Sequence, residues 1–131
     1  PELMQRRKSI IKKYDSACDN LGVRHLIHYT DSIKSSGHLY LTRIPGADDS
    51  VRREIMIKLA ERGVNTNVHY KPLPMMTAYK NLGFDIKDYP NAYHQYENLI
   101  SLPIFSTMTD EQNEYVIENF VDILKKRGLI K

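Results

Sequence analysis

The stretch from Gly63 to Pro74, GVNTNVHYKPLP, constrains the fold of this chain more than any other. Its first residue is a glycine, which is typical of the position just after a helix, and residues 65–69 favour a short strand. Pro72 and Pro74 then restrict the backbone of a polar loop. The stretch therefore predicts a helix end, a strand and a rigid loop, and loops held by a scaffold often carry function.

The composition indicates one globular domain. The chain has 131 residues, of which 41% are hydrophobic, enough for a single core. Cys18 is the single cysteine and cannot form an internal disulfide, so we expect a reducing compartment and a cytoplasmic location. No apolar run approaches the roughly 20 residues of a membrane span, and the basic start lacks the apolar stretch of a signal peptide. We expect no membrane partner.

The basic residues gather at the two ends of the chain. Residues 1–13 hold five basic residues against one acidic residue, and a second cluster lies at 125–131, so the excess positive charge is terminal. No recognition motif accompanies this charge, so we expect no nucleic-acid partner and interpret both clusters as solvated helix faces.

Helical spacing of apolar residues, together with capping residues and glycine stops, predicts five helices. They cover residues 1–21, 49–62, 75–82, 90–98 and 110–127. Asp48 or Asp49 caps the second helix, and Val64, just beyond Gly63, is expected to pack back on its last turn. The last helix is marked most clearly, by a capping box formed by Thr109 and Gln112.

Residues 38–44 combine aromatic and β-branched side chains and end at a Pro-Gly turn, which predicts the central strand of a sheet. Weaker strand signals lie at 23–29 and at 65–69. The apolar run 99–104 contains a proline and predicts a short edge strand. A strand, helix and strand over 38–69 would form one compact unit with the helix on one face, which indicates an α+β fold.

Most residues that could carry chemistry have a structural explanation. His25 and His28 are three residues apart, but no cysteine or third histidine nearby completes a metal-ligand set, so we expect no metal site. Cys18 has no histidine beside it in sequence and is expected to be a buried hydrophobic residue. Paired acids at 48–49 and 110–111 begin helices, where capping explains them. We assign no catalytic residue.

His69, Tyr70 and Lys71 are the candidate binding residues. Their imidazole, phenol and ammonium groups offer donors suited to an anionic or hydroxyl-rich ligand. The alternative is that His69 ends a strand inside the core, Tyr70 packs, and Lys71 is simply exposed to solvent. The residue types alone leave both interpretations open.

Residues 63–73 resemble the G-I-x-T-x-V-H-Y-x-P-L segment of the DegT/StrS-type sugar aminotransferases, which use pyridoxal phosphate (PLP). Other segments resemble that family in the same order, and together they cover nearly the whole chain. They are Arg6-Arg7-Lys8 with Tyr14 and Leu21, His38-Leu39-Tyr40, Tyr89-Pro90-Asn91-Ala92, Ser101-Leu102-Pro103 and Thr109-Asp110-Glu111-Gln112. Two positions depart from the pattern: Pro74 stands where histidine is common, and Tyr93 where glutamate is often found.

The resemblance implies the C-terminal small domain of a fold-type I aminotransferase, an α+β fold with a small, mostly antiparallel sheet packed with helices. Residues 1–22 would connect from a large domain outside this sequence, and residues 23–131 would form an α/β sandwich with a substrate-facing loop at 69–74. In that family the large domain carries the Schiff-base lysine and most PLP contacts. The chain alone is therefore not expected to be catalytic.

The implied parent enzyme transfers an amino group from glutamate, through PLP, to a nucleotide-linked keto sugar in polysaccharide biosynthesis, and works as a homodimer. His69 and Tyr70 would form hydrogen bonds to the substrate, and Lys71 would contact an anion. The alternative is a stand-alone, non-catalytic ligand-binding or assembly module. A regulator that kept the fold but lost the activity is a third interpretation.

Overall fold

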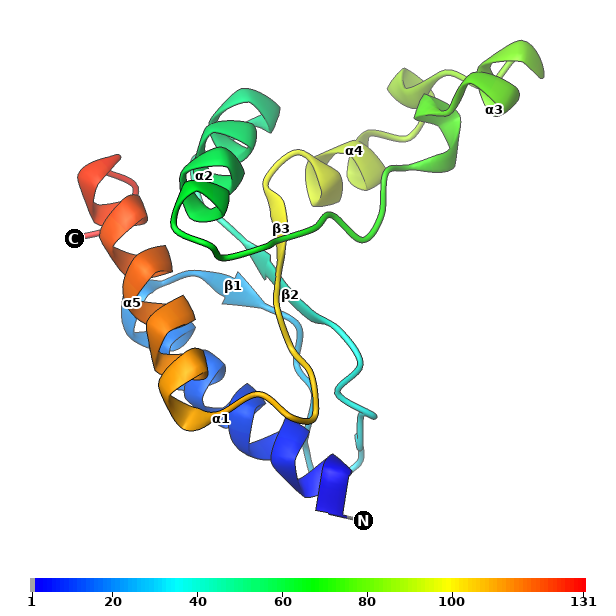
Figure 1. Cartoon of the computed structure of the whole chain (residues 1–131). Coiled ribbons are helices and arrows are strands. Elements are labelled where there is room, and N and C mark those ends of the chain that lie inside the picture. The colour runs from blue at the N-terminus through cyan, green and yellow to red at the C-terminus, as the bar shows by residue number, and fades with distance from the viewer. Residues whose placement is uncertain (1) are drawn as a thin grey trace.

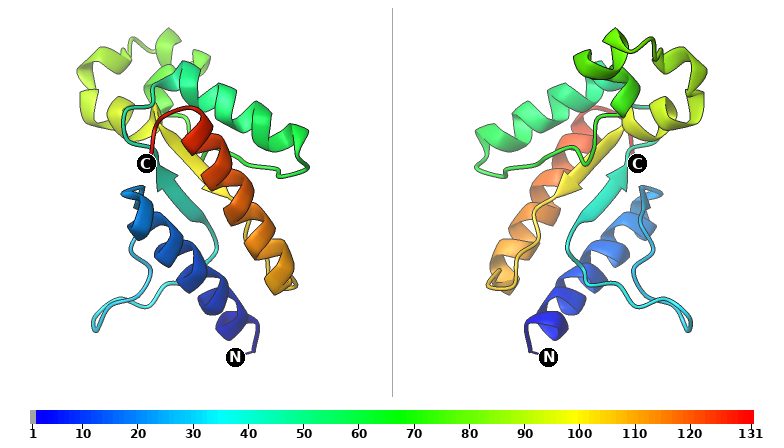
Figure 2. Two further views of the ribbon diagram at one scale, coloured as in Figure 1. Left: turned by 90° about the vertical axis from the view of Figure 1, so that its left-hand side faces the viewer. Right: turned by 90° about the vertical axis from the view of Figure 1, so that its right-hand side faces the viewer.

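A three-stranded antiparallel sheet forms the centre of the fold, and the structure, a computed structural model, describes residues 2–131. The strands are β1 (Arg24–His25), β2 (Tyr40–Arg43) and β3 (Leu99–Leu102). The helices are α1 (Glu2–Leu21), α2 (Asp49–Glu61), α3 (Thr77–Asn81), α4 (Pro90–Tyr96) and α5 (Asp110–Lys126), with 3-10 turns η1 (Leu73–Met75) and η2 (Ile86–Asp88). Helices α1, α2 and α5 lie along one face of the sheet (Figure 1 and Figure 2). The predicted α+β class is confirmed.

Strand β2 lies in the middle of the sheet, as its sequence predicts, with β1 and β3 antiparallel on either side. Tyr40 and Thr42 are fully buried, and the ring of Tyr14 from α1 lies 4.7 Å from that of Tyr40, so this face of β2 meets the helices. The register pairs Leu41 with Ser101. Because directly opposed residues share a face, Leu41 and Ser101 belong to the face turned away from the helices.

The ends of α2 follow the local signals in the sequence. The side chain of Asp48 accepts a hydrogen bond from the backbone N–H of Val51 at 2.8 Å and so caps the helix. Gly63 ends the turn after the helix with a φ of +74°. The backbone N–H of Val64 then donates to the carbonyl of Leu59, and Val64 is buried against the core, which confirms the predicted packing on the last turn.

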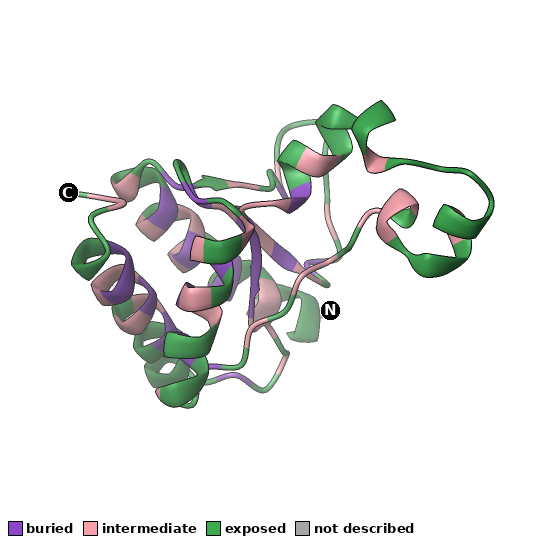
Figure 3. Ribbon diagram, turned by 90° about the horizontal axis from the view of Figure 1, so that it is seen from above, coloured by how far each residue is buried: buried purple, intermediate pink, exposed green. Residues whose placement is uncertain are grey.

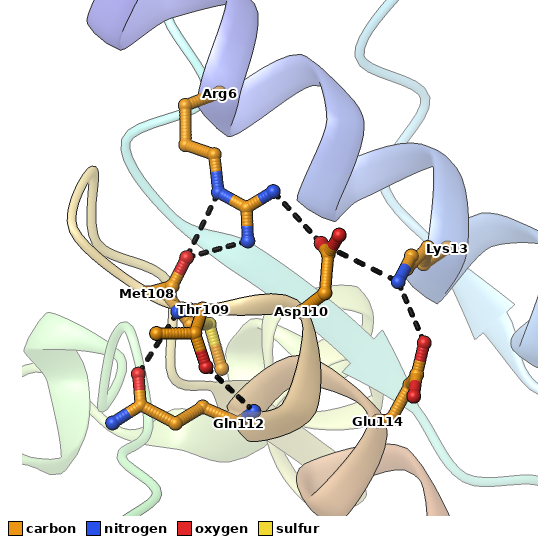
Figure 4. Close-up of polar contacts among 7 residues, drawn as sticks. All are labelled: Arg6, Lys13, Met108, Thr109, Asp110, Gln112 and Glu114. Carbon is orange, nitrogen blue, oxygen red and sulfur yellow. Dashed lines mark hydrogen bonds and ion pairs between the residues drawn. The ribbon is translucent and has the colours of Figure 1, made fainter.

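Helix α5 begins at the predicted capping box. The side chain of Thr109 accepts from the backbone N–H of Gln112 at 3.2 Å, and the side chain of Gln112 accepts from the N–H of Thr109 at 3.0 Å (Figure 4). Val116, Phe120 and Ile123 follow on one face and are buried in the core. Within residues 2–131, no helix combines the length and apolar surface that a membrane span requires.

Helix α1 is held to the start of α5 by two basic side chains (Figure 4). Arg6 donates to the carbonyl of Met108 at 2.8 and 2.5 Å and forms an ion pair with Asp110 at 2.8 Å. Lys13 lies 2.8 Å from the carboxylate of Glu114. The hydrogen bond from Arg6 holds the pKa of Asp110 below its usual value. Because both carboxylates are exposed and the two basic side chains are only half-buried, these ion pairs orient the two helices more than they stabilise them.

The segment from Asn65 to His69 is not the strand that its sequence predicts. It forms a single antiparallel bridge, in which the backbones of Asn67 and Ser101 exchange hydrogen bonds of 3.2 and 2.7 Å. The side-chain oxygen of Asn67 also accepts from the N–H of Val68 at 2.7 Å. Such local side-chain bonds compete with the regular ladder of a strand. The weak strand predicted over 23–29 likewise shortens to the two residues of β1.

Residues 69–95 form an arm that extends away from the remaining residues, which we call the body (Figure 3). None of the arm residues, all of which the structure describes, is buried. Helix α3, predicted over 75–82, covers 77–81, and α4 begins at Pro90 as predicted. Where the arm rejoins the body, the buried guanidinium of Arg52 in α2 donates to the backbone carbonyl of Tyr96 at 2.6 Å.

Candidate functional site

His69 lies where the chain passes from the body into the arm. Its Nδ1 is 2.9 Å from the hydroxyl oxygen of Ser101, which is 4% exposed and belongs to the sheet face turned away from the helices. The imidazole also packs edge to face on the ring of Tyr70, with centroids 4.7 Å apart. The peptide bond between the two residues is cis. Two contacts therefore position His69, and within residues 2–131 its Nε2 has no hydrogen-bond partner.

Tyr70 and Lys71 extend into solvent beside it. Tyr70 is 70% exposed and Lys71 is exposed, and neither side chain makes a hydrogen bond or ion pair within residues 2–131. The interpretation that His69 ends a strand and Tyr70 packs in the core is therefore wrong, although Lys71 is exposed as that interpretation expects. The segment therefore combines one imidazole held by Ser101 with an exposed phenol and an exposed ammonium group.

A cavity of about 300 Å³ lies beside His69. Its polar lining includes His38, from just before β2, Asn67, and Ser101 from β3. In the sequence, His38 begins the predicted central strand and Ser101 lies in the predicted edge strand, and neither pattern connects these residues with His69. For Ser101 the available signal was a hydroxyl inside an otherwise apolar strand. For His38 no local pattern indicates a role in the site.

Two other titratable residues singled out in the sequence, His25 and Cys18, have structural surroundings that explain them. The ring nitrogens of His25 lie 3.1 Å from Asp15 and 3.0 Å from Asp19. Burial lowers the pKa of His25, but the hydrogen bond to Asp19 and the charge of Asp15 outweigh this effect and raise the pKa above its usual value. Burial raises the pKa of Cys18 to about 11, so the thiol is protonated at neutral pH. Within residues 2–131, no three potential metal ligands lie close enough together to hold an ion.

The chain is similar in sequence to parts of longer proteins. The sequence profile of the DegT/DnrJ/EryC1/StrS aminotransferase family matches residues 1–121. The spore coat polysaccharide biosynthesis protein SpsC of Bacillus subtilis is 30% identical over 129 residues, which are 95% of this chain and 33% of that protein. The UDP-4-amino-4,6-dideoxy-N-acetyl-beta-L-altrosamine transaminase of Campylobacter jejuni is 28% identical over 123 residues, which are 94% of this chain and 32% of that enzyme.

The fold is similar to parts of solved structures. The putative sugar aminotransferase Spr1654 from Streptococcus pneumoniae, in its PMP form, superimposes with a TM-score of 0.93 at 48% identity, over 96% of this chain and 32% of that one. A PLP form of the same protein matches equally well. Helicobacter pylori PseC, an aminotransferase involved in the biosynthesis of pseudoaminic acid, has a TM-score of 0.79 at 25% identity, over 94% of this chain and 33% of that one. The chain thus spans about a third of the length of the relatives it matches.

Proposed function

Since this chain belongs to the DegT/DnrJ/EryC1/StrS aminotransferase family as a C-terminal domain, we propose that its parent enzyme passes an amino group from glutamate, through PLP, to a nucleotide-linked keto sugar. The observation that carries the proposal is the superposition of 96% of the chain on a putative sugar aminotransferase at 48% identity. The name of the Campylobacter relative supports a UDP-linked amino sugar as the class of product. The choice of glutamate as donor rests on the resemblance to the family.

In this proposal PLP is bound mainly by a part of the parent outside this sequence. A lysine that forms a Schiff base needs an amine that loses its proton readily, which requires burial or a nearby cation. No lysine among residues 2–131 is buried, and Lys71 extends into solvent. This supports the proposal that the lysine holding PLP belongs to another part of the parent. When bound in the parent, PLP supplies the electron sink for the transfer, and the PLP form of a similar structure supports this cofactor.

The residues of this chain contribute binding groups. Nε2 of His69 and the hydroxyl of Tyr70 form hydrogen bonds to the substrate, and the ammonium of Lys71 contacts an anionic part such as a phosphate. Ser101 keeps the imidazole of His69 in place for this contact. Residues 1–22 connect to the large domain, loop 69–74 faces the substrate, and the parent is a homodimer with its active site near the subunit boundary.

The proposal for the parent is tested by the native protein itself. An antibody raised against this chain should recover from the source cells a species much heavier than 15.3 kDa that carries PLP absorbance. That species should release 2-oxoglutarate when given glutamate, because donor transamination needs no sugar. A native species of about 15.3 kDa without PLP would instead favour the stand-alone binding module.

The binding roles are tested by substitution in the parent enzyme. His69→Ala, Tyr70→Phe and Lys71→Ala should each lower kcat/KM for the nucleotide sugar, by roughly tenfold for each lost hydrogen bond or charge contact. Lys80→Ala is the matched control, because Lys80 is another exposed lysine of the arm and lies outside the proposed site. Unchanged kcat/KM in all three variants would remove the site assignment and leave family membership intact.

A further inference from the structure

The cavity beside His69 has an unusual lining. Its volume, about 300 Å³, lies at the lower end of the range for small-molecule sites. Its polar lining consists of two imidazoles, two amides and two hydroxyls. These belong to His38, Asn65, Thr66, Asn67, His69 and Ser101. The cavity thus draws on three separate segments of the chain, which meet on the sheet face turned away from the helices.

The charge of this lining limits what can bind. It includes no aspartate, glutamate, lysine or arginine, so it lacks the fixed charge that favours phosphates, carboxylates or hard cations. Amides, hydroxyls and imidazoles both donate and accept hydrogen bonds, as the hydroxyls of a sugar do. Leu39, Pro103 and Ile104 supply an apolar wall that suits the C–H face of a sugar ring. The lining therefore fits a neutral, hydroxyl-rich ring.

The two imidazoles differ in how they are held. Nδ1 of His69 is bound to Ser101, so one ring position is fixed before any ligand arrives. His38 is exposed at the cavity and, within residues 2–131, its side chain has no hydrogen-bond partner. Both of its ring nitrogens are available to a ligand.

We propose that this cavity is a sugar-binding subsite and that His38 is a further binding residue in it, beside His69. The inference rests on the proposed function for the origin of the sugar, which is the keto sugar of the nucleotide-linked substrate. Lys71 does not line the cavity. The anionic part of the substrate is therefore bound outside it, near Lys71, and the sugar ring inside it.

The test uses the histidine ring signals of the 131-residue chain in NMR spectra. N-acetylglucosamine is the sugar probe, and inorganic pyrophosphate is titrated separately as an anion probe. We expect saturable shifts of the His38 and His69 ring signals with the sugar, at millimolar concentrations because a single ring offers few contacts. His94, which is exposed on α4 in the arm, should not move. No saturable shift of His38, or a stronger response of both rings to pyrophosphate, would overturn the subsite.

Substitution makes the test independent of signal assignment. His38→Ala should raise the dissociation constant for N-acetylglucosamine roughly fivefold, the effect of one lost hydrogen bond, whereas His94→Ala should leave it unchanged. His38→Gln, which keeps a hydrogen-bonding group, should lie between the wild type and His38→Ala. Equal binding by all variants would overturn the role of His38.

The outcomes for the subsite and for the proposed function can be told apart. If the parent transaminates but the sugar does not bind in the cavity, only the subsite proposal fails. If the sugar binds in the cavity but the parent carries no PLP, only the proposed function fails.

Discussion

The body and the arm differ in what determines their structure. In the body, α1, α2 and α5 bury apolar side chains against the sheet, and residues such as Tyr40 and Phe120 are almost fully enclosed. In the arm, Leu82 is 74% exposed and no residue from 69 to 95, a range described in full, is buried. The arm is shaped by local signals instead, among them Asp85, whose side chain accepts from the N–H of Lys87. The buried core determines the structure of the body, whereas turns and helix caps determine the structure of the arm.

Removing one phenylalanine from each region tests whether the body alone is stabilised by a buried core. Phe120→Ala in α5 leaves a cavity in the core and should lower the free energy of unfolding by about 3–5 kcal/mol. Phe84→Ala in the arm, where the ring is 42% exposed, should lower it by less than about 1 kcal/mol. Urea denaturation measures both values. A loss for Phe84→Ala as large as that for Phe120→Ala would mean that the arm shares the core of the body.

The joint between the two regions depends on Arg52. Its guanidinium is 3% exposed, pairs with Asp49, donates to the carbonyl of Tyr96 and lies 4.3 Å from the centre of the Tyr96 ring. Arg52→Ala should lower the free energy of unfolding by about 2–3 kcal/mol, because it leaves buried polar groups without partners. It should also speed hydrogen exchange in α4.

Arg53→Ala is the control for this joint, because Arg53 shares the carboxylate of Asp49 but is exposed. We expect no measurable change in unfolding for Arg53→Ala. If both variants behaved alike, the arm would not be joined to the body through Arg52.

At the other end of the arm, Ser101→Ala removes the hydrogen bond that positions His69. We expect a loss of about 1 kcal/mol in the free energy of unfolding, together with a change in the ring-nitrogen shifts of His69. Ser50→Ala, at an exposed position early in α2, should change neither quantity. Unaltered His69 signals in Ser101→Ala would show that the imidazole is held by the arm rather than by the body.

The smallest expected effect is a pH dependence confined to the body. The raised pKa of His25 contributes stability that is complete below its usual value of 6.5 and is lost as pH rises through the folded-state pKa. Burial lowers the pKa of His28, so its contribution is present above 6.5 and is lost as pH falls through the folded-state pKa. His25→Gln should therefore flatten the decline of Tm above pH 6.5, and His28→Phe the decline below it.

His94 offers a control for the pH dependence, because it is an exposed histidine of the arm. His94→Gln should leave the curve of Tm against pH unchanged. A shift as large as that for His25→Gln would contradict the confinement of this effect to the body.

The sequence predicts the body well because its signals are local. The capping box at Thr109 and the cap at Asp48 each lie within one turn of the helix that they begin. The strand predicted over 65–69 fails because the side chain of Asn67 binds the neighbouring backbone, which alternation of residue types does not reveal. In the arm, apolar residues such as Leu82 are of the same types as the core residues of the body. Residue type alone therefore does not predict that their side chains are exposed.

The candidate site is predicted in part. His69, Tyr70 and Lys71 stand next to one another, and their residue types allow binding without deciding between binding and a structural role. The contact that positions His69 joins it to Ser101, 32 residues further along the chain, and depends on how the segment after α2 lies beside β3. His38 comes to the same cavity from a third segment. Periodicity describes neighbours along the chain, so it does not report contacts made across the sheet.

Both ends of the arm meet the same strand. The chain enters the arm beside Ser101, through the bridge to Asn67, and returns at Leu99, only two residues earlier in β3. Because both attachment points of the arm lie on β3, the arm can change in length at a small entropic cost. Such a change does not move the buried side chains of the body. A change in the length or sequence of the arm would therefore leave the helices and the sheet of the body in their present arrangement.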